Sequence, residues 1–121
     1  MIHLPHDHDH VTGQILEAMP SVEECEKVAE VFKLISDGTR LRIVLLLCHC
    51  EECVNNIAAA VEMSEPAVSH HLRVLKKSDL ITSRREGKEV YYKIADTSTA
   101  KLVHQVCEQM LQITCPAEIC R

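Results

Sequence analysis

The pattern of apolar and polar positions predicts a mainly α-helical chain with one β-hairpin. Apolar residues fall on one face at helical spacing in residues 21–35, 54–61, 64–77 and 98–114. Residues 80–85 and 89–94 are instead rich in branched and aromatic side chains. Gly87 lies between these two runs and can adopt the positive φ of a hairpin turn. The expected order is therefore helices, a hairpin and a last helix.

The helix expected at residues 64–77 has a defined start and a cationic outer face. Ser64 can accept a hydrogen bond from the first-turn amides, and Pro66 within that turn sacrifices no helical bond. The residues at core spacing are Ala67, Val68, Leu72 and Leu75. The outward residues are Ser69, His70, Arg73, Lys76 and Lys77. A short helix at 54–61 and a turn precede it, which predicts a helix-turn-helix unit whose second helix can enter a major groove.

The hairpin after this unit has a cationic tip made of Arg84, Arg85 and Lys88. Taken alone, such a tip is typical of a solvated charged hairpin. Because it follows directly on a helix-turn-helix, we interpret it as a wing whose long cationic side chains contact phosphates without reading sequence.

In these motifs the chain resembles the ArsR/SmtB family of metal-responsive winged helix-turn-helix repressors, over roughly residues 20–110. The matching residues are 37–43 (Asp-Gly-Thr-Arg-Leu-Arg-Ile), 52–54 (Glu-Cys-Val), 69–76 (Ser-His-His-Leu-Arg-Val-Leu-Lys), and 85–88 (Arg-Glu-Gly-Lys) with Tyr91 and Tyr92. The resemblance implies a homodimer built from the first and last helices, and double-stranded operator DNA as its partner.

Length and composition indicate one small domain. Chains of this size often complete their hydrophobic core by forming a dimer. Of the 121 residues 46% are hydrophobic, but there are only one Phe, two Tyr and no Trp, which suits helix packing. We expect a flexible His-rich arm at 1–20, the winged domain with its dimerisation helices at 21–114, and a tail at 115–121. Neither a membrane span nor a signal segment is expected, so the protein would be cytoplasmic and its seven cysteines reduced thiols or metal ligands.

Charge is segregated along the chain. The net charge of -5 does not by itself suggest nucleic acid binding. Residues 64–93, however, hold seven Lys/Arg against four Asp/Glu, a local +3, whereas residues 1–63 hold four against eleven, a local -7. A positive face on an acidic body can still bind phosphate, with affinity that falls steeply as salt rises.

Two segments are rich in metal ligands. The first ten residues include His3, His6, His8 and His10, and the stretch Cys-His-Cys-Glu-Glu-Cys includes Cys48, Cys50 and Cys53. Thiolates bind soft or borderline ions, here Zn(II), Cd(II), Pb(II), Cu(I) or As(III), and imidazoles of the arm can complete the shell. Cys48 ends an apolar run and is equally typical of a small buried side chain, and Cys25 lies on the apolar stripe of 21–35 and is expected in the core. The arm is also interpretable as a weak metal buffer or a solubilising end.

The resemblance implies an effector site in which the arm of one subunit joins a Cys at the start of the third helix, in a motif like Glu-Leu-Cys-Val-Cys. Cys53 matches the first thiolate of that motif, Asn55 stands at the second, and Cys50 is the candidate replacement.

A second family site, on the last helix, has only Asp96 here, because Ser98, Gln109 and Gln112 stand where further ligands would be. His104 and Cys107 are neighbours on one helical face and with Cys115 or Cys120 could form another site; a histidine beside a buried cysteine at a dimer interface is the alternative.

The sequence therefore predicts a dimeric repressor that releases its operator when a soft or borderline metal binds. One alternative is a repressor that senses thiol oxidation or reactive sulfur. Another is a metal-binding or storage protein that does not bind an operator. An enzyme is not expected, since there is neither a glycine-rich phosphate loop nor an acid and base pair at recognisable spacing.

Overall fold

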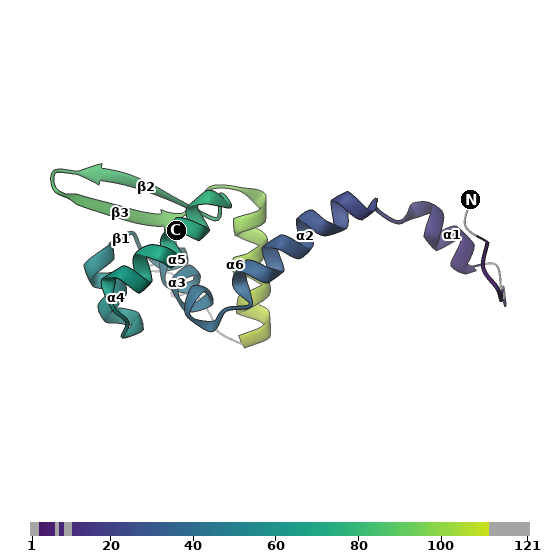
Figure 1. Cartoon of the computed structure of the whole chain (residues 1–121), viewed down its shortest axis with the longest axis horizontal. Coiled ribbons are helices and arrows are strands. Elements are labelled where there is room, and N and C mark those ends of the chain that lie inside the picture. The colour runs from purple at the N-terminus through teal and green to yellow at the C-terminus, as the bar shows by residue number, and fades with distance from the viewer. Residues whose placement is uncertain (1–2, 7, 9–10, 112–121) are drawn as a thin grey trace. The chain divides into compact units, whose positions relative to one another are not determined.

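The computed structural model describes residues 3–6, 8 and 11–111, and the chain divides into two compact units, Met1–Val31 and Phe32–Arg121. The first unit contains α1 (Val11–Ala18) and most of α2 (Val22–Ile35). After α2 come α3 (Gly38–His49), β1 (Glu52–Cys53), α4 (Val54–Val61), α5 (Glu65–Lys77), β2 (Ile81–Glu86), β3 (Glu89–Ile94) and α6 (Ser98–Leu111) (Figure 1). The prediction of a mainly helical chain with one hairpin is confirmed. Helix α1 was not predicted and lies within the expected arm.

Helix α2 begins with a capping box. The Ser21 amide donates to the Glu24 carboxylate at 3.2 Å, and the Glu24 amide donates to the Ser21 hydroxyl at 3.1 Å. In the described residues the stripe of apolar residues that follows is exposed: Val28 and Phe32 are 57% and 62% exposed. Cys25, expected in the core from the same stripe, is also exposed, so that expectation was wrong for the described part of one chain.

The core lies where α3, α4, α5, the sheet and α6 meet. Asp37 caps α3 by accepting a hydrogen bond from the Arg40 amide at 3.0 Å, which holds the pKa of the Asp37 carboxyl below its usual value. The largest fully buried side chains are Ile43, Val44, Leu47, Ile57, Val68, Leu72, Leu75, Leu80 and Ile81. Three of the four residues expected to face the core from 64–77 are thus fully buried, and Ala67 is half-buried.

The turn between α4 and α5 is short because each helix end is satisfied locally. Helix α4 ends at Glu62, whose backbone is left-handed (φ 56°), and the Met63 amide donates to the Ala58 carbonyl at 3.1 Å. Ser64 then caps α5 by accepting from the Ala67 amide at 3.3 Å, and Pro66 occupies the first turn. The helix-turn-helix predicted from these residues is confirmed.

The sheet has three antiparallel strands in the order β1-β3-β2, one more than predicted. Strands β2 and β3 pair along their whole length, from Ile81 with Ile94 to Glu86 with Glu89. Gly87 has φ 63° in the two-residue turn between them. We call β2, β3 and this turn the wing. The short strand β1 adds Glu52 and Cys53 to the other edge of β3.

Helix α6 starts at Ser98 as predicted, and its expected end at residue 114 lies outside the described residues, as does the tail at 115–121. Its face toward the core contributes Val103 and Cys107, whereas Leu102 and Met110 are 59% and 79% exposed. Within the part of the chain that the structure describes, every helix is too short or too polar to cross a membrane.

Candidate nucleic-acid interface and metal-ligand clusters

Helix α5 presents its predicted outer face to solvent. His70, Arg73, Lys76 and Lys77 are exposed and Ser69 is half-buried, as the helical spacing required. The cap at Ser64 fixes where the helix begins, and the buried side chains of Val68, Leu72 and Leu75 fix which face turns outward. The second helix of a helix-turn-helix therefore offers one cationic, polar face.

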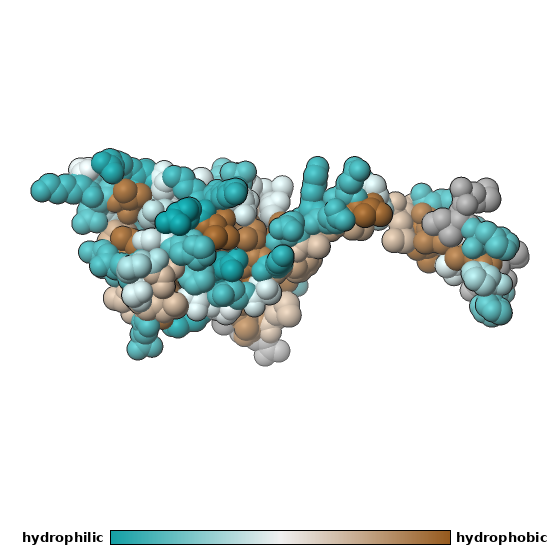
Figure 2. All heavy atoms as spheres, viewed as in Figure 1, coloured by the Kyte–Doolittle hydropathy of each residue, from teal (hydrophilic) through white to brown (hydrophobic). Residues whose placement is uncertain are grey.

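The wing carries two further exposed cations, Arg85 and Lys88. Figure 2 shows hydrophilic side chains projecting from the end of the β2–β3 hairpin. Among the described residues, none forms an ion pair with Arg73, Lys76, Lys77, Arg85 or Lys88. These five side chains keep their full positive charge for a polyanion such as a nucleic acid backbone.

Arg84 differs from the other wing cations because carboxylates already hold it. Its Nε and Nη2 donate to the Glu51 carboxylate at 2.7–3.0 Å, and its Nη1 donates to Glu86 Oε2 at 2.7 Å. These hydrogen bonds lower the pKa of Glu51 and raise that of Arg84. The guanidinium carbon lies 4.9 Å from the centre of the Tyr91 ring. Arg84 was predicted to contact phosphate, but here its charge is compensated.

Cys50 directly follows α3, and Cys53 is the second residue of β1, so Glu51 and Glu52 lie between the two cysteines. Cys50 ends α3, and its Sγ donates to the Leu46 carbonyl at 3.4 Å; burial is the main cause that raises the pKa of this thiol, and the Glu52 charge adds to it. Cys53 is in β1, opposite Tyr91, and is the N-cap residue of α4. Both side chains are half-buried.

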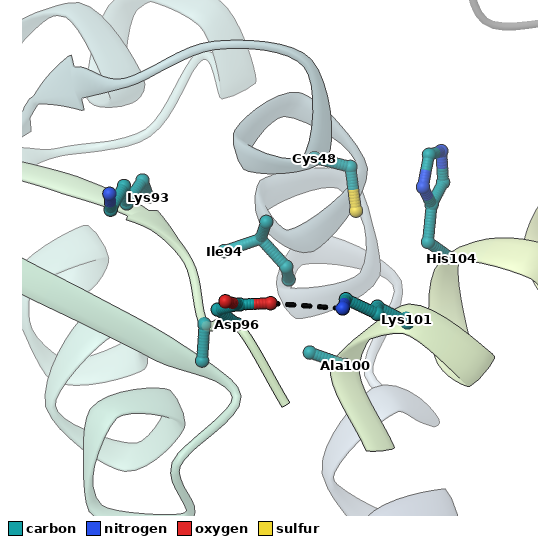
Figure 3. A pocket seen from close by; sticks show the side chains of 8 residues that line it. Cys48, Lys93, Ile94, Asp96, Ala100, Lys101 and His104 are labelled. Carbon is teal, nitrogen blue, oxygen red and sulfur yellow. Dashed lines mark ion pairs between the residues drawn. The ribbon is translucent and has the colours of Figure 1, made fainter. Parts of the chain in front are cut away.

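Cys48 lies on α3 and lines a cavity of about 370 Å³. Burial, followed by the nearby Cys107 and Glu108, raises the pKa of the Cys48 thiol to about 12. Figure 3 shows Cys48 among the side chains that line this cavity, together with the ion pair of Asp96 and Lys101 and with His104 on the neighbouring helix α6. The sequence allowed two interpretations of Cys48, a small buried side chain or a metal ligand. Its half-buried position is compatible with both.

The second predicted set, Asp96, His104 and Cys107, is only partly brought together. Asp96 and His104 line the same cavity, but Asp96 is exposed and pairs with Lys101 at 3.0 Å. His104 Nε2 lies 2.7 Å from Glu108 Oε1, and the His104 ring meets the His49 ring edge-on at 5.3 Å. Cys107 is buried. The i,i+4 spacing of His104 and Glu108 is a signal from which this pair could have been predicted.

The histidines of the arm belong to the first unit. His6 and His8 stack with ring centroids 5.8 Å apart, and His10 lies outside the described residues. Nowhere in residues 3–6, 8 and 11–111 do three His, Cys, Asp or Glu side chains gather closely enough to hold a metal ion. The donor types at Cys50 and Cys53 fit a soft or borderline ion, but a shell of three or more donors would require a rearrangement or a further donor from outside the described residues.

The helix-turn-helix, the cationic face of α5 and the wing together define a winged helix-turn-helix protein of the nucleic-acid-binding class. The family model "Bacterial regulatory protein, arsR family" matches residues 37–83. A protein described as "Transcriptional repressor SmtB homolog" from Synechocystis is 37% identical over 97 residues, which cover 80% of this chain and 74% of that one. The chain thus belongs to the arsR family of bacterial transcriptional regulators, as the sequence motifs predicted.

Two further similarities agree with this family. The "Arsenical resistance operon repressor" of Escherichia coli is 38% identical over 86 residues, covering 66% of this chain and 74% of that one. A solution structure from Mycobacterium bovis, described as a homodimeric winged helix-turn-helix DNA-binding domain, superposes with a TM-score of 0.65 at 35% identity, covering 78% of this chain and 88% of that one.

Proposed function

We propose that this protein is a homodimeric repressor that binds operator DNA through α5 and the wing and releases it when a soft or borderline metal ion binds near Cys50 and Cys53. The observation that carries the proposal is the exposed, unpaired cationic face of a helix-turn-helix in a chain whose similar proteins are named as repressors. Acting on DNA, it would work in the cytoplasm.

The roles in DNA binding follow from position on the two elements. Ser69, His70 and Arg73 lie toward the start and middle of α5 and would reach base edges in the major groove. The phosphate contacts would come from Lys76, Lys77, Arg85 and Lys88. Arg84 takes no part in this set, because its guanidinium is held by Glu51 and Glu86.

A second copy of the chain would cover the apolar residues that one chain leaves exposed. Val22 and Phe32 on α2 are 74% and 62% exposed, and Leu102 and Met110 on α6 are 59% and 79% exposed. Large apolar side chains concentrated on two helices are typical of an interface. The homodimeric description of the Mycobacterium bovis domain supports the same arrangement, which would place two α5 helices on two half-sites.

The metal part of the proposal rests on the donors at residues 50 and 53. Thiolates suit Zn(II), Cd(II), Pb(II) and As(III), and His6, His8 and His10 of the arm would supply further donors. A Staphylococcus aureus protein described as a cadmium resistance regulatory protein homolog is 43% identical over 79 residues. Such an ion would supply the free energy for binding both thiols, at the cost of the thiol contact to Leu46.

The test is a fluorescence anisotropy titration of the reduced, chelator-treated full chain against a duplex from its own promoter region, repeated with each of the four ions. We expect tight binding without metal, no comparable binding to a scrambled duplex, and release by at least one ion. Cys50→Ser and Cys53→Ser should abolish release. Binding that no ion changes, or release that survives both substitutions, would contradict the proposal.

A further inference from the structure

The one side-chain ion pair between the wing and the segment 50–53, among the described residues, is that of Arg84 with Glu51. The two residues are 33 positions apart in sequence, and three donor–acceptor distances of 2.7–3.0 Å join them. A guanidinium group that donates from two nitrogens to one carboxylate fixes the relative orientation of the two groups as well as their distance. The position of the Glu51 carboxylate therefore restrains the wing strand β2.

The sheet places the same residues in one row. Cys53 on β1 is opposite Tyr91 on β3, and Tyr91 is opposite Arg84 on β2. Directly opposed residues of an antiparallel sheet project to the same face, so the Cys53 thiol, the Tyr91 ring and the Arg84 guanidinium share one side. The guanidinium packs on that ring at 4.9 Å. A movement of Cys53 on β1 would thus act on the neighbouring strand β3, whose Tyr91 ring packs against Arg84.

Holding one ion with donors of this segment must rearrange it, because no three His, Cys, Asp or Glu side chains gather closely enough to hold a metal ion in the described residues. Cys50 is held at the end of α3 by its amide and thiol contacts to the Leu46 carbonyl, at 3.2 and 3.4 Å. Cys53 is held by its pairing in β1. Glu51 and Glu52 lie between the two cysteines, so a ligand that draws the Cys50 thiol away from the Leu46 carbonyl acts directly on the backbone of Glu51.

We propose that the Glu51–Arg84 ion pair couples the Cys50–Cys53 segment to the wing, with Glu51 and Arg84 as positioning residues rather than phosphate contacts. In the metal-free protein the pair holds the wing beside α5. When the segment rearranges around a ligand, the Glu51 carboxylate leaves Arg84, and the wing loses its restraint. The part of this inference that concerns a bound ligand rests on the proposed function. The restraint of the wing by the Glu51–Arg84 pair in the metal-free protein does not.

The first measurement uses the metal-free full chain and hydrogen exchange of the wing amides. Glu51→Gln should speed exchange in β2 and β3 by about threefold or more, because the restraint on the hairpin is lost. Glu86→Gln is the matched control: it removes the other carboxylate of Arg84, which lies on the wing itself, and should leave exchange near wild type. Unchanged exchange in Glu51→Gln, or equal acceleration in both variants, would overturn the proposal.

The second measurement is the ratio of operator Kd values with and without Cd(II). We expect wild type and Glu86→Gln to show a ratio of about 10–100, and Glu51→Gln, Arg84→Gln and their double variant all to fall below about threefold. Arg84→Lys, which keeps the charge without the fork, should also lose most of the ratio. A full ratio in Glu51→Gln refutes the coupling. A wild-type ratio of one instead refutes Cd(II)-dependent release, while the exchange data still decide the metal-free part.

Discussion

Lys88 offers the sharpest test of the DNA-binding surface, because its charge is exposed and unpaired. It follows Gly87 in the turn of the wing, and no described residue forms an ion pair with it. Lys88→Gln removes that charge and retains most of the side-chain length. The loss should therefore appear in the salt dependence of operator binding rather than in stability.

The magnitude follows from counting phosphate contacts. Each phosphate contact contributes about -0.9 to the slope of log K against log salt, so the four phosphate-contacting cations in each of two protomers give a slope of about -7. Lys88→Gln removes one contact per protomer and should bring the slope to about -5. Between about 50 and about 200 mM salt, the variant should thus lose about tenfold less affinity than wild type.

The assay is fluorescence anisotropy with one operator duplex at four or more salt concentrations, metal-free and reduced. Lys101→Gln is the matched control, since it makes the same substitution at an exposed lysine on α6. This lysine already pairs with Asp96 at 3.0 Å. Its slope should equal that of wild type. An unchanged slope in Lys88→Gln, or an equal reduction in Lys101→Gln, would refute the assignment of unpaired cations to phosphate.

Three other expectations concern α5 and the half-buried thiol of Cys48. Leu75→Ala, at a fully buried position, should lower the free energy of unfolding by about 2–5 kcal/mol in a urea titration; a loss below that range would mean that the site can collapse. Ser64→Ala removes the cap of α5 and should cost about 1 kcal/mol, whereas Ser69→Ala, on the same helix without a cap role, should cost less. Because the pKa of Cys48 is raised to about 12, its thiolate fraction at pH 8 is low, about 10⁻⁴, so mass spectrometry should show alkylation that rises about tenfold per pH unit. A pH-independent rate would contradict this reasoning.

The features predicted correctly from sequence are those with local signals. Ser64, Pro66 and Gly87 each act within a few residues, and the apolar spacing of α5 gave both its core side and its outer side.

The features that were missed depend on distant partners or have weak signals. The strand β1 is only two residues long and forms because β3 offers a free edge. The Glu51–Arg84 pair joins positions 33 apart, and the sequence suggested only that Arg84 was a free cation. Helix α1 contains a Thr and a Gly, which favour helix weakly, and it is eight residues long. Cys25 lies on an apolar stripe, but a stripe does not reveal which chain covers it.

The measurement that bears most directly on the central claim is metal affinity of the reduced protein, free and saturated with operator. If metal binding weakens DNA binding through the Cys50–Cys53 segment, linkage requires that operator weaken metal binding by the same factor, about 5–150-fold. We predict that a competition titration with a metal indicator gives that factor, equal to the ratio of operator Kd values with and without the ion. Identical metal affinity for the free and the operator-bound protein would contradict the account.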